Sequence, residues 1–143
     1  MTAPFTRSVL QAIEDFAAGL QIDHIVRSET GSVSFRLDRA GLMSFFPAQD
    51  GRRTLVSLKR TPRRPPRTED LESFLGLAGW EPYLHAPINA GMTADGGFLL
   101  IASLSNDDVN RQSVEVCLDR LAALHDQAGP DDRAGRHEGF AMS

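Results

Sequence analysis

The chain has 143 residues and 41% hydrophobic content, enough to build one hydrophobic core, so a single domain is expected. Its formal net charge of -4 argues against a general nucleic-acid binder, which needs a basic surface to displace the counterions of the phosphates. Its one cysteine, Cys117, excludes an intramolecular disulfide and a zinc site built from clustered thiolates.

No segment has the composition of a targeting or membrane-spanning sequence. The first residues lack the uninterrupted apolar run of a signal peptide, and no apolar run is long enough to cross a bilayer. We therefore expect a cytoplasmic protein that neither inserts into a membrane nor leaves the cell by the general secretory pathway.

An amphipathic helix is predicted over residues 6–20. Apolar side chains recur there at three- and four-residue spacing, which places them on one helical face. Thr6 is a suitable N-cap, because its hydroxyl can accept a hydrogen bond from a backbone N–H of the first turn. The apolar positions are Val9, Ile13, Phe16, Ala17 and Leu20.

Three consecutive strands are predicted next, as an antiparallel meander. Residues 33–37 alternate between apolar and polar side chains, as a strand with one buried face does. The apolar runs 42–46 and 54–58 follow, and turn residues at 38–41 and 50–51 separate the three strands.

The segment 59–67, KRTPRRPPR, is predicted to be an exposed connection, since it holds three prolines and no apolar periodicity. Its basic charge suits an acidic partner or a phosphate backbone, and the spacing of Pro62 and Pro65 suits an SH3 groove. A solvated linker is the simplest interpretation, and the sequence leaves the role of this segment open.

A second helix is predicted to begin at Thr68, its N-cap, and to end at Gly79 and Pro82. Its apolar stripe comprises Leu71, Phe74, Leu75 and Ala78. Leu77 and Trp80 lie beside or off this stripe, which gives the helix an additional apolar face of the kind that an interface needs.

Two further strands and a closing helix complete the pattern. The apolar stretches 83–92 and 98–104 flank Asp95-Gly96-Gly97, a strong hairpin signal. Residues 106–108 are expected to cap the last helix, which stops before Gly129.

The element order is therefore α-β-β-β-α-β-β-α, which indicates an α+β fold with an antiparallel sheet. We expect one domain over residues 1–128. The polar, glycine-containing tail, 129–143, is expected to be disordered.

No constellation of catalytic or metal-binding residues is recognisable. The four histidines fall in four different segments, without a second ligand at metal-binding spacing. Cys117 lies on the apolar side of the last helix, where an inert core thiol is expected. We therefore predict no catalytic residue, no metal and no cofactor, and a protein that acts by binding another protein.

Two of the predicted strands carry more apolar side chains than one buried face requires. Residues 42–46 are apolar at four of five positions and residues 98–102 at all five. Both faces of such strands need cover, which either helices on both faces of the sheet or an external partner can supply. The sequence does not decide between these two possibilities.

This layout resembles the class I type III secretion chaperones, the CesT-like or Tir-chaperone family, over most of residues 8–127. The resemblance lies in the opening amphipathic helix, the alternation at 33–37 and the leucine-rich short helix at 70–77. The apolar segment 91–104 with its Asp-Gly turn and the closing helix match as well. The proline-rich basic insert differs from the usual family pattern.

The resemblance implies a homodimer that binds the N-terminal segment of a secreted effector as an extended chain and keeps it competent for export, with a role in virulence. The family needs no cofactor, nucleic acid or membrane insertion for this work. The alternative is another non-catalytic α+β protein-interaction or regulatory domain.

Two groups of residues are predicted to make these contacts. The residues expected to touch the partner lie on the first helix and the apolar strands: Leu10, Phe35, Met43, Phe45 and Leu55. The residues expected in the dimer interface are Phe74, Leu77 and Trp80. Which face of the sheet is outward cannot be decided from the sequence, so ordinary core positions remain the alternative for the first group.

Overall fold

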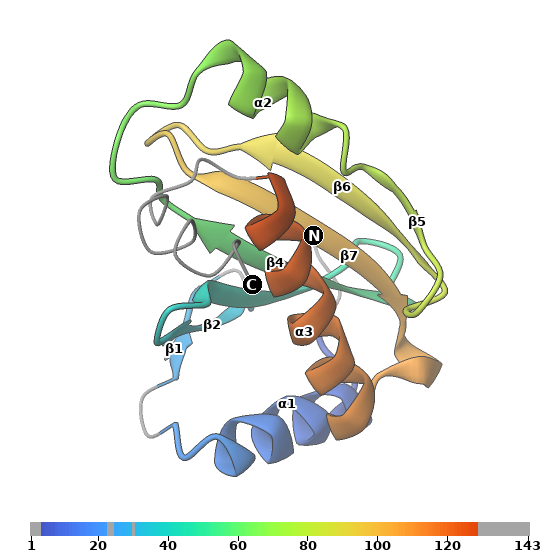
Figure 1. The fold of residues 1–143 in the computed structure, drawn as a ribbon. Coiled ribbons are helices and arrows are strands. Elements are labelled where there is room, and N and C mark those ends of the chain that lie inside the picture. The colour runs from blue at the N-terminus through green and yellow to red at the C-terminus, as the bar shows by residue number, and fades with distance from the viewer. Residues whose placement is uncertain (1–3, 23–24, 30, 129–143) are drawn as a thin grey trace, which may run out of the picture.

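The computed structural model describes residues 4–22, 25–29 and 31–128, which form helices and one antiparallel sheet (Figure 1). The helices are α1 (Arg7–Gly19), α2 (Thr68–Leu75) and α3 (Arg111–Ala128), with a 3-10 turn, η1 (Asn106–Asp108), before α3. The strands are β1 (Val26–Arg27), β2 (Val33–Leu37), β3 (Gly41–Pro47), β4 (Arg53–Arg60), β5 (Gly79–Glu81), β6 (Ala86–Met92) and β7 (Phe98–Ser105).

The sheet is built from two antiparallel blocks. Its strand order is β1-β2-β3-β4-β7-β6-β5, so the meander β1 to β4 meets the block β5 to β7 where β4 pairs with β7. The α+β class, the meander and the β6–β7 hairpin are therefore confirmed. Strands β1 and β5 lie at the two edges.

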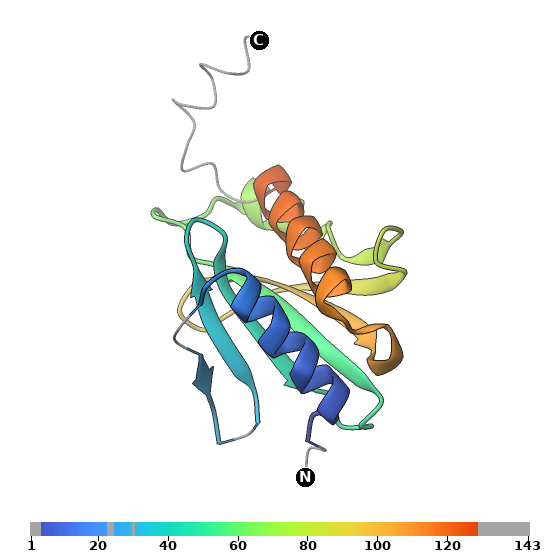
Figure 2. The same ribbon diagram turned by 90° about the horizontal axis from the view of Figure 1, so that it is seen from below.

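All three helices lie on the same face of the sheet. Helix α1 packs beside α3, and α3 contacts β4 and β7, as Figure 2 shows from below. Phe16 of α1 stacks on Phe35 of β2 at 5.9 Å between ring centroids, and Phe74 of α2 lies 4.5 Å from Phe98 of β7. These aromatic contacts anchor α1 and α2 to the core.

The first helix begins as predicted. The Thr6 hydroxyl accepts a hydrogen bond from the Val9 backbone N–H at 3.2 Å. Its apolar face is buried at Val9, Ile13, Phe16 and Ala17, whereas Leu20 lies beyond the helix and is exposed.

The last helix is capped by a residue other than the predicted ones. Asn110 Oδ1 accepts from the Ser113 backbone N–H at 2.8 Å, and Ser113 Oγ accepts from the Asn110 backbone N–H at 2.9 Å. Asn106 is engaged elsewhere, because its side chain accepts from Thr54 Oγ1 and donates to the Gly51 carbonyl. Residues 106–108 form the 3-10 turn instead.

The second helix is shorter than predicted. It ends at Leu75, and its N-cap is Arg67, whose backbone N–H donates to Asp70 Oδ2 at 2.8 Å, so that Thr68 is the first helical residue. Gly79 has a φ of 147°, which a helix cannot continue through, and β5 pairs with β6. Trp80 therefore lies on an edge strand and not on a helix.

The basic connection is also shorter than predicted, because Lys59 and Arg60 belong to β4. Arg60 Nε donates to the Ala40 carbonyl at 2.7 Å, and its Nη1 lies 2.6 Å from Asp126 of α3. The predicted tail, 129–143, lies outside the described residues. Among the residues that are described, no helix is long and apolar enough to cross a membrane.

Candidate functional site

The pairing register of the strands shows which side chains share a face of the sheet, and the helices pack on one of the two faces. Phe45, Val56 and Ala102 lie opposite one another across β3, β4 and β7, and all three are fully buried beneath the helices. The neighbouring cross-strand pair, Phe46 of β3 and Leu55 of β4, lies on the opposite side of the sheet. Because α1, α2 and α3 lie on the first side, no helix in the described part of the chain covers the second side.

We call this second side the open face. Strand alternation and the pairing register assign to it the strand residues Val26, Ser34, Arg36, Leu42, Ser44, Phe46, Arg53, Leu55, Ser57, Lys59, Trp80, Pro87, Asn89, Gly91, Leu99, Ile101, Ser103 and Ser105. The face thus combines aliphatic, aromatic and serine side chains with three cations.

At the centre of the open face, a row of serines that crosses the strands is flanked by apolar side chains. Ser34 and Ser44 are joined by an Oγ–Oγ hydrogen bond of 2.8 Å, and Ser44 lies opposite Ser57. The next row is larger and apolar, with Phe46 directly opposite Leu55 and 37% exposed. Partly exposed aliphatic side chains without helical cover can bury further area against a partner.

Arg53 lies at one end of β4 on this face. Its Nε donates to Ser103 Oγ at 2.6 Å and its Nη2 donates to the Ser103 carbonyl at 2.5 Å. The guanidinium is therefore held over the sheet by neutral partners.

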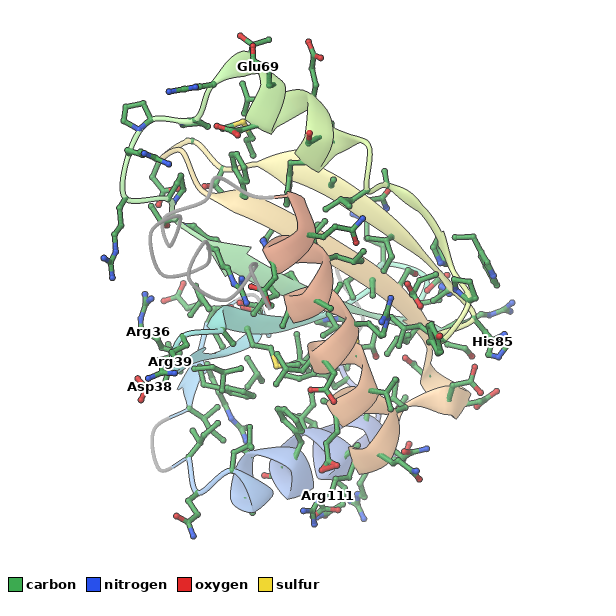
Figure 3. The ribbon with its side chains drawn as sticks, viewed as in Figure 1. Arg36, Asp38, Arg39, Glu69, His85 and Arg111 are labelled. Carbon is green, nitrogen blue, oxygen red and sulfur yellow. The ribbon has the colours of Figure 1, made fainter. Side chains whose placement is uncertain are left out.

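Lys59 lies at the other end of β4. Its Nζ is 2.7 Å from Asp95 Oδ2 in the β6–β7 turn, and this hydrogen bond, followed by one from Thr93, lowers the pKa of Asp95 to about 2. A Cβ on Gly97 would stand 2.5 Å from Lys59 Cε, so glycine at this position allows the lysine to cross the turn. Arg36, by contrast, is exposed beside the β2–β3 turn, at a corner of the molecule remote from Arg111 (Figure 3).

A second exposed apolar region lies at the β5 edge of the sheet. Trp80 is 64% exposed, Tyr83 is 71% exposed, and Leu75 at the end of α2 is half exposed. Arg120 of α3 stacks on the Tyr83 ring at 4.6 Å and lies 3.4 Å from the buried carboxylate of Glu81. We call Trp80 of β5 and Tyr83 of the turn that follows it the β5 patch.

The structure separates the residues predicted to touch a partner into two sets. Phe35, Met43 and Phe45 are 2%, 0% and 0% exposed and face the helices, so they are core residues, and expecting them at an accessible surface was wrong. Leu55 lies on the open face, and Leu10 of α1 is partly exposed. For these two, partner contact stays a prediction.

The residues predicted to lie in the dimer interface also differ in their exposure. Phe74 is fully buried against Phe98 and His125, whereas Leu77 is partly buried and Trp80 is exposed. The sequence reasoning missed that Trp80 and Tyr83 share an exposed edge, since this depends on β5 being a strand.

The apolar residues of the open face were not chosen from the sequence either: Leu42, Phe46, Leu99 and Ile101. Their signal was the two-sided apolar pattern of β3 and β7. That pattern indicates that both strand faces are apolar, but the side that the helices cover is decided by tertiary packing.

The titratable groups of the core have structural roles. Burial raises the pKa of the Cys117 thiol to about 12, which opposes thiolate chemistry. Burial lowers the pKa of His125 to about 4, and its ring packs on Phe74. Within the described parts of the chain, no three His, Cys, Asp or Glu side chains lie close enough together to hold a metal ion.

Comparison with known proteins places the fold. No protein-family model and no curated protein matches the chain. A chain in the crystal structure of the Yersinia pestis type III secretion chaperone SycH, in complex with a stable fragment of YscM2, matches with a TM-score of 0.63 at 16% identity, covering 85% of this chain and 99% of that one.

A chain in the structure of the HopA1-SchA chaperone-effector complex matches with a TM-score of 0.54 at 18% identity, covering 87% of this chain and 95% of that one. Both alignments span nearly the whole of the matched chains, so they include the sheet and its helices. The three helices and the antiparallel sheet with one open face thus form a fold like that of class I type III secretion chaperones.

Proposed function

We propose that this protein is a type III secretion chaperone that binds the N-terminal segment of a secreted effector and keeps it competent for export. The observation that carries the proposal is the open face, which exposes apolar side chains in a fold otherwise found in chaperone complexes. The function is binding without catalysis, and the cytoplasm is the compartment where an effector awaits export.

The sheet offers two kinds of contact to an extended polypeptide. Apolar side chains of the segment can cover the open face, at roughly 25 cal/mol for each Å² of apolar surface removed from water. The outer edge of β1 has no strand partner within the described residues, so it can accept a segment backbone as an added strand. Neither contact requires the segment to fold.

The β5 patch supports a homodimer as part of the proposal. Trp80 lies on an edge strand and Tyr83 lies in the turn that follows it, so a second copy can reach both. Large aromatic side chains are the residues that most often dominate protein interfaces. We therefore assign the dimer contact to the β5 patch, Trp80 included, and the effector contact to the part of the open face that β2, β3, β4 and β7 form.

The test is co-expression with N-terminal fragments of the proteins encoded beside its gene. We expect one fragment to form a stable complex in which its amide hydrogens exchange nearly as fast as in an unfolded chain, apart from those that pair with the sheet. Deleting the gene for this chain should abolish export of that protein without affecting export of unrelated substrates. Unchanged export in the deletion strain would contradict the proposal.

A further inference from the structure

We infer that the open face selects an extended segment with two acidic side chains about six residues apart and apolar side chains between them. This inference rests on the proposed function, because it names the chemistry of the segment that such a chaperone would recognise. It is carried by the distribution of charge on the open face.

The strands of the open face carry cations and no carboxylate. Arg36, Arg53 and Lys59 belong to it, whereas none of the described strand positions that define it is Asp or Glu. The chain as a whole has 19 acidic and 15 basic residues, so the balance of charge is reversed on this face. A complementary segment would therefore be acidic.

Two of the cations are spaced along one strand. Arg53 and Lys59 are six positions apart in β4, and the even separation puts both on the same face. At about 3.3 Å per residue their Cα atoms are about 20 Å apart. Leu55 lies between them, and Ile101 of β7 lies opposite Ser57. An extended segment along β4 has the same rise, so acids six positions apart would reach both cations.

The cations are already ordered for this contact. Arg53 is fixed by two hydrogen bonds to Ser103, neither of which neutralises its charge. Lys59 is held by Asp95, an exposed carboxylate that an incoming one could join or displace. Because these side chains lose little conformational entropy on binding, a carboxylate gains more from each contact.

Two other occupants fit the open face less well. A second copy packed face to face would bring the same cations together without any strand carboxylate to pair with them. A single-stranded nucleic acid needs a series of aromatic surfaces for its bases. The described strand residues of this face include only Phe46 and the edge residue Trp80 as aromatic side chains, and between Arg53 and Lys59 the face is aliphatic or serine. A polypeptide with acidic and apolar side chains complements both the cations and the apolar surface of the open face.

Three synthetic peptides of equal length test the inference. They share a Ser- and Leu-based sequence and differ only at two positions six residues apart, which hold Glu, Gln or Lys. By isothermal titration calorimetry we expect the Glu peptide to bind at least about tenfold more tightly than the Gln peptide, and the Lys peptide to bind most weakly. The advantage of the Glu peptide should shrink as salt is raised.

Charge reversal supplies the matched variants. The double variant Arg53→Glu/Lys59→Glu should invert the preference, so that the Lys peptide binds best. Arg36→Glu changes an exposed side chain of the same face and should weaken the Glu peptide and strengthen the Lys peptide, each by less than the double variant does, which keeps the test decisive if the double variant fails to fold. Arg7→Glu, on α1 and the opposite face, is the control and should leave all three affinities unchanged.

Equal affinities for the three peptides, or a preference that the variants do not alter, would overturn the inference. So would displacement of the Glu peptide by an oligothymidine, or a halved mass of Arg36→Glu in light scattering, which would assign the face to nucleic acid or to a second copy. An effector fragment that binds the double variant as well as the unchanged chain refutes this inference but leaves the proposed function standing. Export that survives gene deletion refutes the function alone.

Discussion

His125 of α3 and Leu58 of β4 are joined inside the core by a hydrogen bond of 2.7 Å, in which the ring Nε2–H donates to the backbone carbonyl. The ring also lies 5.4 Å from that of Phe74, between centroids. This contact links the end of the last helix to the middle of the sheet and to α2. Both the neutral ring and the imidazolium can donate this bond, but burial disfavours the imidazolium, and this gives the fold a pH dependence.

We predict that stability falls as the pH drops from 7 to 5. Burial lowers the pKa of His125 from 6.5 to about 4, so the unfolded chain binds a proton in this range that the folded chain does not. The stability contributed by the neutral ring is therefore present above pH 6.5 and is lost toward pH 4. The expected loss by pH 5 is about 2 kcal/mol.

Urea unfolding at both pH values measures this loss. In His125→Gln, whose amide can still donate to Leu58, the fall in unfolding free energy should be smaller by about 2 kcal/mol. His85→Gln is the control, because His85 is exposed, and it should behave like the unchanged chain. An identical fall in His125→Gln would mean that other groups cause the pH dependence.

The β5 patch yields a prediction about oligomeric state. Trp80→Ala should weaken self-association by roughly 2 kcal/mol, or about thirtyfold in the dissociation constant, because a large exposed indole is the expected anchor of the interface. Sedimentation velocity over a concentration series measures this shift. Val116→Ala removes an exposed apolar side chain of α3 instead and should leave the mass unchanged. A chain that is monomeric at tens of micromolar before any substitution would refute the dimer.

Truncation after Gln127 tests the predicted end of the domain. The described contacts of the last turn of α3 are made by His125 and Asp126, which the truncated chain keeps. We expect its melting temperature to stay within a few degrees of the full chain. Truncation after Asp119 removes Leu121 and His125 from the core and should prevent folding. A large drop for the first truncation would mean that a residue such as Phe140 docks on the domain.

Elements defined by their own residues were predictable from the sequence. The apolar stripe of α1 and its Thr6 cap depend only on residues near in sequence, and the alternation in β2 predicts which of its side chains share a face. Strands β1 and β5 have two and three residues, too few for any period to be read. Trp80 was assigned to a helix because β5 exists only through its pairing with β6.

The candidate site was harder to predict because it depends on where the helices pack. Strand β3 is apolar on both sides, so its sequence suits either face as the core. Met43 and Phe45 are buried on the side that the helices cover, and Leu42 and Phe46 face the other side, because the described helices lie on one side only. The choice of Met43 and Phe45 as contact residues was wrong for this reason, while the surplus of apolar residues was a sound signal.

Phe45 and Phe46 are adjacent, chemically identical and on opposite faces, so they form a matched pair. Phe46→Asp should preserve the melting temperature within a few degrees and weaken effector binding by about 2 kcal/mol, because it sets a charge among the apolar side chains of the open face. Phe45→Asp buries an unpaired carboxylate in the core and should cost more than about 4 kcal/mol, enough to unfold the domain. Thermal melting and calorimetry with the effector fragment separate the two effects. Full binding by a folded Phe46→Asp variant would remove the open face from the effector site.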